Sequence, residues 1–199
     1  MNRREAIQRS ALALGYAITG PALIGVLNGC KAAPELTFKP KFLSEDQARV
    51  VSSLCEVIIP KTTTPGAIDA GVPAFVDDML GEVYPAADQG RFVNGLKAFD
   101  DEAKKIYGSH FAECKREEQI ALVKKHHDAL AGKANDSSAG WWRAGGGIAK
   151  PFMVEMKELT LLGFFTSQPG ATEVLQYNMA PGPFKGCVPL AEVGKAWAT

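Results

Sequence analysis

The most chemically versatile residues in this 199-residue chain are its four cysteines, because a cysteine side chain can bind a metal, form a disulfide or accept a lipid. No Cys-x-x-Cys-His motif is present, so the sequence predicts no covalently attached c-type haem. Beyond Cys30 there are Cys55, Cys114 and Cys187, an odd set. Either Cys55 pairs with Cys114 and leaves Cys187 for a partner chain, or Cys114 pairs with Cys187, or all three stay reduced.

The three histidines do not predict a metal site. His126 and His127 are adjacent on a predicted helix, so their side chains diverge by about 100° and cannot share one metal ion through local geometry. The only other histidine is His110. Surface or core roles are therefore expected for all three.

Other motifs that could carry catalysis or bind a cofactor are also weak. Gly145-Gly146-Gly147 lacks the spacing and the preceding strand of a phosphate-binding loop. Ser137-Ser138 lie in a polar loop without a local base. Paired acids occur at three places and are interpreted as solvated helix faces or first turns: Asp77-Asp78, Asp100-Asp101 and Glu117-Glu118. We therefore expect no catalytic residue, no metal and no cofactor in this chain.

Charge gives no indication of a polyanionic partner. Lysine plus arginine equals aspartate plus glutamate, at 22 each, and no clustered basic face is apparent. Because nucleic-acid binding requires such a face, nucleic acid is not expected as a partner.

Residues 1–30 are predicted to be an export signal. Arg3-Arg4 precede a weakly apolar run that contains glycines and a proline, which is typical of a twin-arginine signal for folded cargo. An ordinary secretory signal with two arginines is the alternative. Either signal implies transport across the inner membrane to the periplasm.

Leu27-Asn28-Gly29-Cys30 is similar to a lipoprotein processing site. If it is processed, Cys30 becomes an acylated N-terminus that anchors the protein to a membrane, and residues 31–42 act as a tether. The alternative is cleavage nearby, which leaves a soluble protein.

The rest of the chain has the periodicity of helices. Ser44 and Gln47 form a capping-box pattern ahead of a helix that ends before Pro60. Helical spacing of apolar residues predicts four more helices, at about 72–83, 92–106, 117–130 and 151–165. The last is apolar nearly all round and is expected to be the most buried. No alternating strand pattern occurs, so the prediction is a small irregular all-α bundle in a single domain, residues 43–199.

The segment 168–199 is too rich in proline and glycine to form one regular element. It carries three aromatic residues, Tyr177, Phe184 and Trp197. An irregular arm with several large apolar side chains either wraps onto the core or waits for a partner, so these residues are candidate interface positions.

Several motifs in order along the chain resemble the gluconate 2-dehydrogenase subunit 3 family, over roughly residues 43–190. The motifs are Glu56-Val57-Ile58-Ile59-Pro60, Thr64-Pro65-Gly66-Ala67, Ala70-Gly71-Val72, Phe75-Val76-Asp77-Asp78-Met79-Leu80, the block Glu158 to Ser167, and Tyr177 with Pro181-Gly182 and Gly186-Cys187.

The resemblance implies a small helical subunit of a periplasmic or membrane-associated sugar or polyol dehydrogenase. Its partner would be a larger catalytic subunit of the glucose-methanol-choline type that holds FAD, and a cytochrome c subunit often accepts the electrons. The small subunit would be non-catalytic and would assist folding and twin-arginine export of the catalytic subunit. Two alternatives stay open: a free-standing envelope lipoprotein that acts as a scaffold or small-molecule binder, and a self-sufficient enzyme with a carboxylate dyad.

Overall fold

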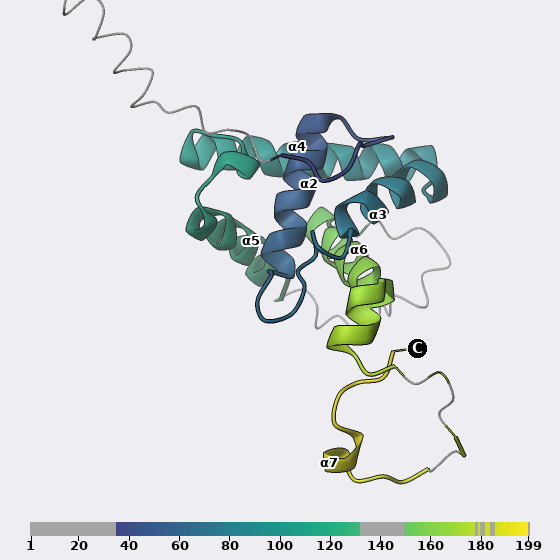
Figure 1. Ribbon diagram of the computed structural model, residues 1–199. Coiled ribbons are helices and arrows are strands. Elements are labelled where there is room, and N and C mark those ends of the chain that lie inside the picture. The colour runs from purple at the N-terminus through teal and green to yellow at the C-terminus, as the bar shows by residue number, and fades with distance from the viewer. Residues whose placement is uncertain (1–34, 132–149, 178, 180–181, 184–185, 199) are drawn as a thin grey trace, which may run out of the picture. The chain divides into compact units, whose positions relative to one another are not determined.

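The computed structural model describes residues 35–131, 150–177, 179, 182–183 and 186–198 (Figure 1). Arg3, Arg4, Cys30, Phe184 and the predicted loop 132–147 lie outside these ranges, so the predictions that rest on them remain predictions. The described residues confirm the all-α class, because all their regular elements are helices. The one β-type contact among them is an isolated bridge between Gln176 and Trp197. The helices are α2 Glu45–Ile58, α3 Val72–Asp78, α4 Ala86–Tyr107, α5 Arg116–Ala131, α6 Phe152–Thr166 and α7 Leu190–Val193, with short turns η1 Met79–Val83, η2 Phe111–Glu113 and η4 Gly170–Val174.

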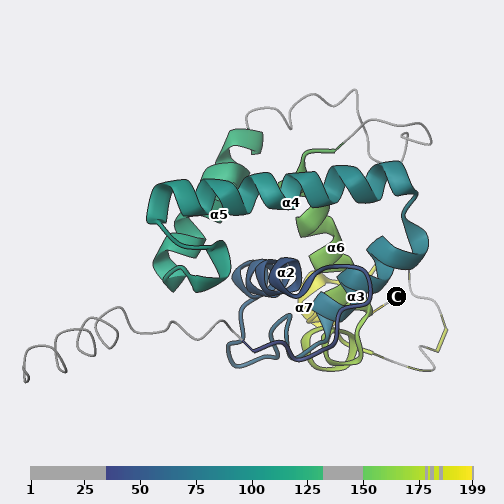
Figure 2. The ribbon, with the colours of Figure 1, turned by 90° about the horizontal axis from the view of Figure 1, so that it is seen from above.

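Helix α2 is the centre of the bundle. The predicted capping box is present: Gln47 N–H donates to the Ser44 hydroxyl, and Ser44 N–H donates to the Gln47 side chain. Apolar positions on several faces of α2 are buried, because α3, α4, α5, α6 and η2 all pack against it. In Figures 1 and 2 the long helix α4 crosses α2, with α3 on one side of α2 and α5 on the other. Helix α6 contacts both α3 and α5.

Helix α6, expected to be the most buried, covers the core with one face and exposes another. Met156, Leu159 and Phe164 are buried, whereas Leu162 and Phe165 are exposed. Gly163 allows α6 to approach α3, since a Cβ on Gly163 would lie 2.6 Å from Phe75 Cδ1. Helix α6 therefore has two apolar faces, one buried and one exposed. The central helix of the bundle is α2, not α6 as predicted.

The segment before α2 is part of the folded body, which differs from the predicted tether. Leu36 and Phe38 pack against the core. The backbone N–H groups of Lys41 and Leu43 donate to the Asp77 carboxylate at 2.6 and 2.8 Å, and Phe42 N–H contacts both carboxylate oxygens at 3.3 Å. Any flexible tether must therefore end before Leu36.

Asp77 corrects the interpretation of its acidic pair as solvated. Its side chain is only 1% exposed, and its two oxygens accept the backbone bonds just described. Asp78 does lie at the surface, where its carboxylate pairs with Lys41 Nζ at 2.7 Å. Asp77 and Asp78 therefore have different roles, one buried and one at the surface, because the side chains of adjacent helix residues point about 100° apart.

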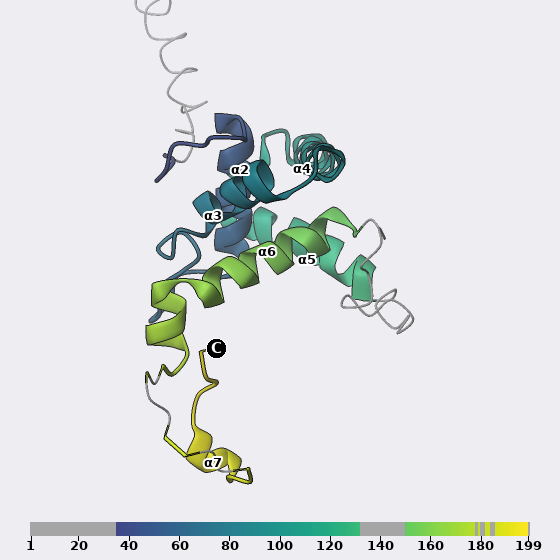
Figure 3. The same cartoon turned by 90° about the vertical axis from the view of Figure 1, so that its right-hand side faces the viewer.

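The C-terminal arm closes on itself after η4 (Figure 3). Gln176 N–H donates to Ala196 O, Ala198 N–H donates to Gln176 O, and the Gln176 side chain donates to the carbonyls of Val193 and Lys195. The arm is irregular, as predicted, but its two ends are joined through the backbone and side chain of one glutamine.

Candidate functional site

A groove of about 690 Å³ lies along the outer face of α6. Its walls come from α6, η1 and the end of η4, and they are mainly apolar. The apolar lining comprises Met79, Leu159, Leu161, Leu162, Phe165 and Leu175, and the polar lining comprises Tyr84, Lys150, Glu155, Glu158 and Thr166. A concave apolar surface with a few polar groups has the composition of a binding site.

Glu155 is the chemically unusual residue of this groove. It is 5% exposed, although it belongs to the first turn of an apolar helix. Its Oε1 accepts from Arg91 Nη2 at 3.4 Å, and its Oε2 has no hydrogen-bond partner within the described structure. Burial raises the pKa of the Glu155 carboxyl above its ordinary value, while Arg91 and Tyr84 oppose that shift. A buried carboxylate with an unmatched oxygen is costly, so it calls for an explanation.

The neighbours of Glu155 only partly compensate its charge. Arg91 is shared, because its guanidinium also pairs with Asp88 one turn earlier on α4. Burial and the adjacent Glu155 carboxylate raise the pKa of Tyr84 to about 12, which keeps its hydroxyl protonated as a donor. At the rim of the groove, Lys150 Nζ pairs with Glu158 at 2.6 Å.

The structure does not bring the cysteines together. Cys55 and Cys187 are free thiols, buried and exposed respectively, so neither predicted intramolecular pairing is present. Cys55 Sγ faces the Thr160 hydroxyl across α2 and α6 at 3.7 Å, whereas Cys114 Sγ faces the carbonyls of Ser109 and His110. Burial raises the pKa of Cys55 to about 12, so its thiol is unreactive near neutral pH. Cys187 lies on the surface of the closed arm, and the intermolecular hypothesis remains a prediction.

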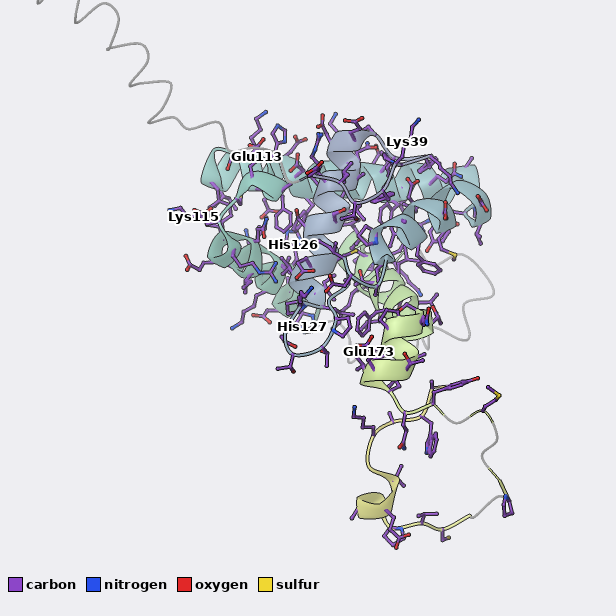
Figure 4. All side chains as sticks on the ribbon, viewed as in Figure 1. Lys39, Glu113, Lys115, His126, His127 and Glu173 are labelled. Atoms are coloured by element: carbon purple, nitrogen blue, oxygen red, sulfur yellow. The ribbon has the colours of Figure 1, made fainter. Side chains whose placement is uncertain are left out.

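Two of the three histidines, His110 and His126, pair with carboxylates. His126 and His127 both lie on α5 (Figure 4). His126 Nε2 is 2.8 Å from Glu102 Oε2, and His110 Nδ1 is 2.6 Å from Asp100 Oδ2. In the part of the chain that the structure describes, no three His, Cys, Asp or Glu side chains are grouped so as to hold a metal ion.

Two of the predicted interface aromatics are exposed on the arm. Tyr177 and Trp197 have 59% and 49% of their surface accessible, and Met179 is also exposed. Leu175, which lines the groove, precedes Tyr177 by two residues in the chain, but Tyr177 and Trp197 are not among the groove's lining residues. Among the described helices, none combines the length and the apolar character that crossing a bilayer requires.

Sequence reasoning missed Glu155 and the groove. A signal was available, because Glu155 is the single acid among Phe152, Met153, Val154 and Met156 at the start of the most apolar helix. An acid at that position would be buried if the helix packed on that side. What the sequence could not supply was Arg91 from α4 as a neighbour.

Comparison with known proteins gives one positive finding. The family model for gluconate 2-dehydrogenase subunit 3 matches residues 45–182, a stretch that contains α2 to α6 and the start of the arm. No curated protein and no solved structure matches the chain. Because the family model covers more than half of the sequence and all the core helices, the chain belongs to the gluconate 2-dehydrogenase subunit 3 family.

Proposed function

We propose that this chain is the non-catalytic small subunit of an FAD-dependent sugar or polyol dehydrogenase complex. The family match over residues 45–182 carries this proposal. The catalytic partner is a larger flavoprotein of the glucose-methanol-choline type, which holds FAD and performs the oxidation. A cytochrome c subunit is a further candidate member, as the acceptor of electrons.

The exposed apolar surface of the chain supports a role in assembly. Leu162 and Phe165 on α6 and Tyr177, Met179 and Trp197 on the arm are large exposed side chains of the types enriched at protein interfaces. Partner binding would cover this surface, which is otherwise unfavourable in water.

The export role rests on the twin-arginine pattern at Arg3-Arg4. A route that carries folded cargo allows the small subunit to bring a signal-less catalytic subunit to the periplasm. Acylation at Cys30 would then anchor the complex to the membrane.

Co-expression tests the complex. The chain is produced with each flavoprotein of this type from its own genome, and the flavin absorbance that elutes with it is measured. We expect one flavoprotein to co-elute, and replacing both Arg3 and Arg4 by lysine should retain both proteins in the cytoplasm. A colourless monomer with every candidate would contradict the proposal.

Two further measurements address the remaining roles. The purified chain with sugar and a dye acceptor should be inert, since hydride transfer belongs to the flavoprotein; turnover by the chain alone would overturn the non-catalytic assignment. Mass spectrometry of the mature N-terminus should find a diacyl or triacyl Cys30, and an unmodified or absent Cys30 would exclude the lipid anchor.

A second candidate function is supported by the size of the groove. A volume of about 690 Å³ falls within the range of small-molecule sites. A free-standing lipoprotein that binds a small apolar ligand would use the same surface. Native mass spectrometry separates the two, because a ligand adds its mass to the isolated chain.

A further inference from the structure

The length of chain between the proposed lipid anchor and the folded body is short. Leu36 already packs against the core, so a lipid on Cys30 is joined to the body by residues 31–35 alone. From Cys30 to Leu36 a fully extended chain reaches at most about 22 Å. A folded body of this size has a diameter of about 40 Å, nearly twice that reach. An anchored chain therefore keeps the surface around Leu36 near the bilayer and cannot turn its far side toward it.

The segment 35–43, which we call the strap, is fixed on the body and has a distinct outer side. Leu36 and Phe38 pack inward, whereas Thr37 and Lys39 are exposed. Lys39 lies at the outer edge of the folded body (Figure 4). Because the Asp77 carboxylate holds the last three residues of the strap, this outer side has a defined orientation on α3.

Large apolar side chains are exposed beside the strap. Phe42 is 37% exposed and lies over η1, since a Cβ on Gly81 would be 3.1 Å from the Phe42 Cβ. Val83 belongs to the same turn and is 61% exposed. We call Thr37, Lys39, Phe42, Gly81 and Val83 the strap face. Exposed apolar side chains beside a long lysine stem suit the headgroup region of a bilayer, where both can be accommodated.

The charges around the strap face nearly cancel. Lys41 Nζ pairs with Asp78 at 2.7 Å and lies 3.8 Å from Glu82. With Lys39 and the exposed Glu35, two lysines stand against three acids, which gives a net charge of −1. A surface with so little net charge is neither strongly drawn to anionic lipids nor strongly repelled by them. Contact with a bilayer would therefore depend on the anchor and the apolar side chains.

We infer that the strap face lies against the bilayer that holds the Cys30 lipid, with Phe42 and Val83 in the headgroup region. This inference rests on the lipid anchor of the proposed function and adds the orientation of the body to it. The lipid supplies the affinity for the membrane, and the short connection determines which side of the body faces it.

The test measures how close single positions lie to lipid. The acylated chain is purified from membranes in a Cys187→Ser background, in which the two remaining cysteines of the body, Cys55 and Cys114, are buried. A bimane fluorophore is attached at Val83→Cys, and the protein is placed in phosphatidylcholine vesicles with or without nitroxide-labelled lipid. Ile120→Cys, on α5 and outside the strap face, is the control because Ile120 is also half exposed, at 47%.

We expect the nitroxide lipid to lower the fluorescence at Val83→Cys at least about threefold and at Ile120→Cys by less than about 1.2-fold. The unfolding midpoint of each labelled variant shows whether it is folded. If Val83→Cys does not fold, Thr37→Cys provides a second exposed position on the same face, with the same expected quenching.

The outcomes separate this inference from the anchor on which it rests. If mass spectrometry finds no acyl group on Cys30, the anchor fails and the inference fails with it. If the chain is acylated and bound to vesicles but both positions are quenched equally, the anchor stands and the inference is wrong. Loss of the quenching at Val83→Cys when the flavoprotein binds would assign the strap face to that partner and would also overturn the inference.

Discussion

Two buried acids in this protein, Asp77 and Glu155, differ in how their charge is compensated. Asp77 accepts backbone N–H groups from three consecutive residues and fixes the segment before α2 onto α3. Glu155 shares the Arg91 guanidinium with Asp88 and has the Tyr84 hydroxyl as its other polar neighbour, and its Oε2 lacks a partner at good hydrogen-bond geometry in the described residues. Because burial costs both carboxylates their hydration, the first is explained by the fold alone and the second is not. The difference separates a structural acid from a candidate binding group.

The largest effect is expected at Asp77. Asp77→Ala leaves the N–H groups of Lys41, Phe42 and Leu43 without their acceptor, and Leu43 is itself buried. We expect the free energy of unfolding to fall by about 3 kcal/mol, measured by urea denaturation. Asp78→Ala, which removes an exposed ion pair with Lys41, should cost less than about 1 kcal/mol. Equal losses would remove the distinction between the two acids.

The inner face of α6 should be nearly as sensitive. In Gly163→Ala the new methyl group would lie 2.6 Å from the Phe75 ring, which must shift. We expect a loss of about 2 kcal/mol in the free energy of unfolding. Gly90→Ala is the matched control on α4, where no atom lies within 4 Å, and it should stabilise the chain by about 0.5 kcal/mol. A neutral Gly163→Ala would show that α3 and α6 pack less closely than described.

The pH dependence of stability should identify Glu155 as the poorly compensated acid. Its folded pKa is raised above the ordinary 4.5, so its ionisation opposes folding, and the stability it contributes is lost as the pH rises through the folded pKa. Arg91 and Tyr84 reduce this shift and Asp88 adds to it. Relative to Glu155→Gln, the wild type should therefore gain stability as the pH falls from neutrality toward 4.5. Urea denaturation at several pH values measures this difference, and a gain in the opposite direction would contradict the assignment.

The smallest effect is expected on the outer face of α6. Leu162→Ser in the isolated chain should change the free energy of unfolding by less than about 0.5 kcal/mol, because the side chain is half exposed and supports no other element. Thermal unfolding of the variant beside Met156→Ser, which alters the fully buried face, checks this. A large loss for Leu162→Ser would mean that the groove is part of the core.

The sequence was informative where a pattern is local. Five helices and the all-α class were predictable from the capping pattern at Ser44, the proline after α2 and the spacing of apolar residues. These signals depend only on neighbours within a few residues of the chain. Long-range contacts were not predictable in this way. Asp77 bonds to residues about 35 positions away in the chain, and Glu155 pairs with a residue 64 positions away. Which of α2 and α6 is more buried likewise depends on how distant helices pack. The exposed Tyr177 and Trp197 were predictable as candidates because aromatics in an irregular segment are unusual.

The closed arm has a practical consequence for how this protein is handled. Trp197 pairs with Gln176, and Gln176 follows Leu175 of the groove directly. A purification tag fused after Thr199 would follow Trp197 by two residues, so its bulk would compete for space with this pairing. Deleting the last few residues would remove the pairing that Ala196 and Ala198 make with Gln176 and open the arm. Binding studies should therefore keep residues 194–199 and carry the tag on the other protein.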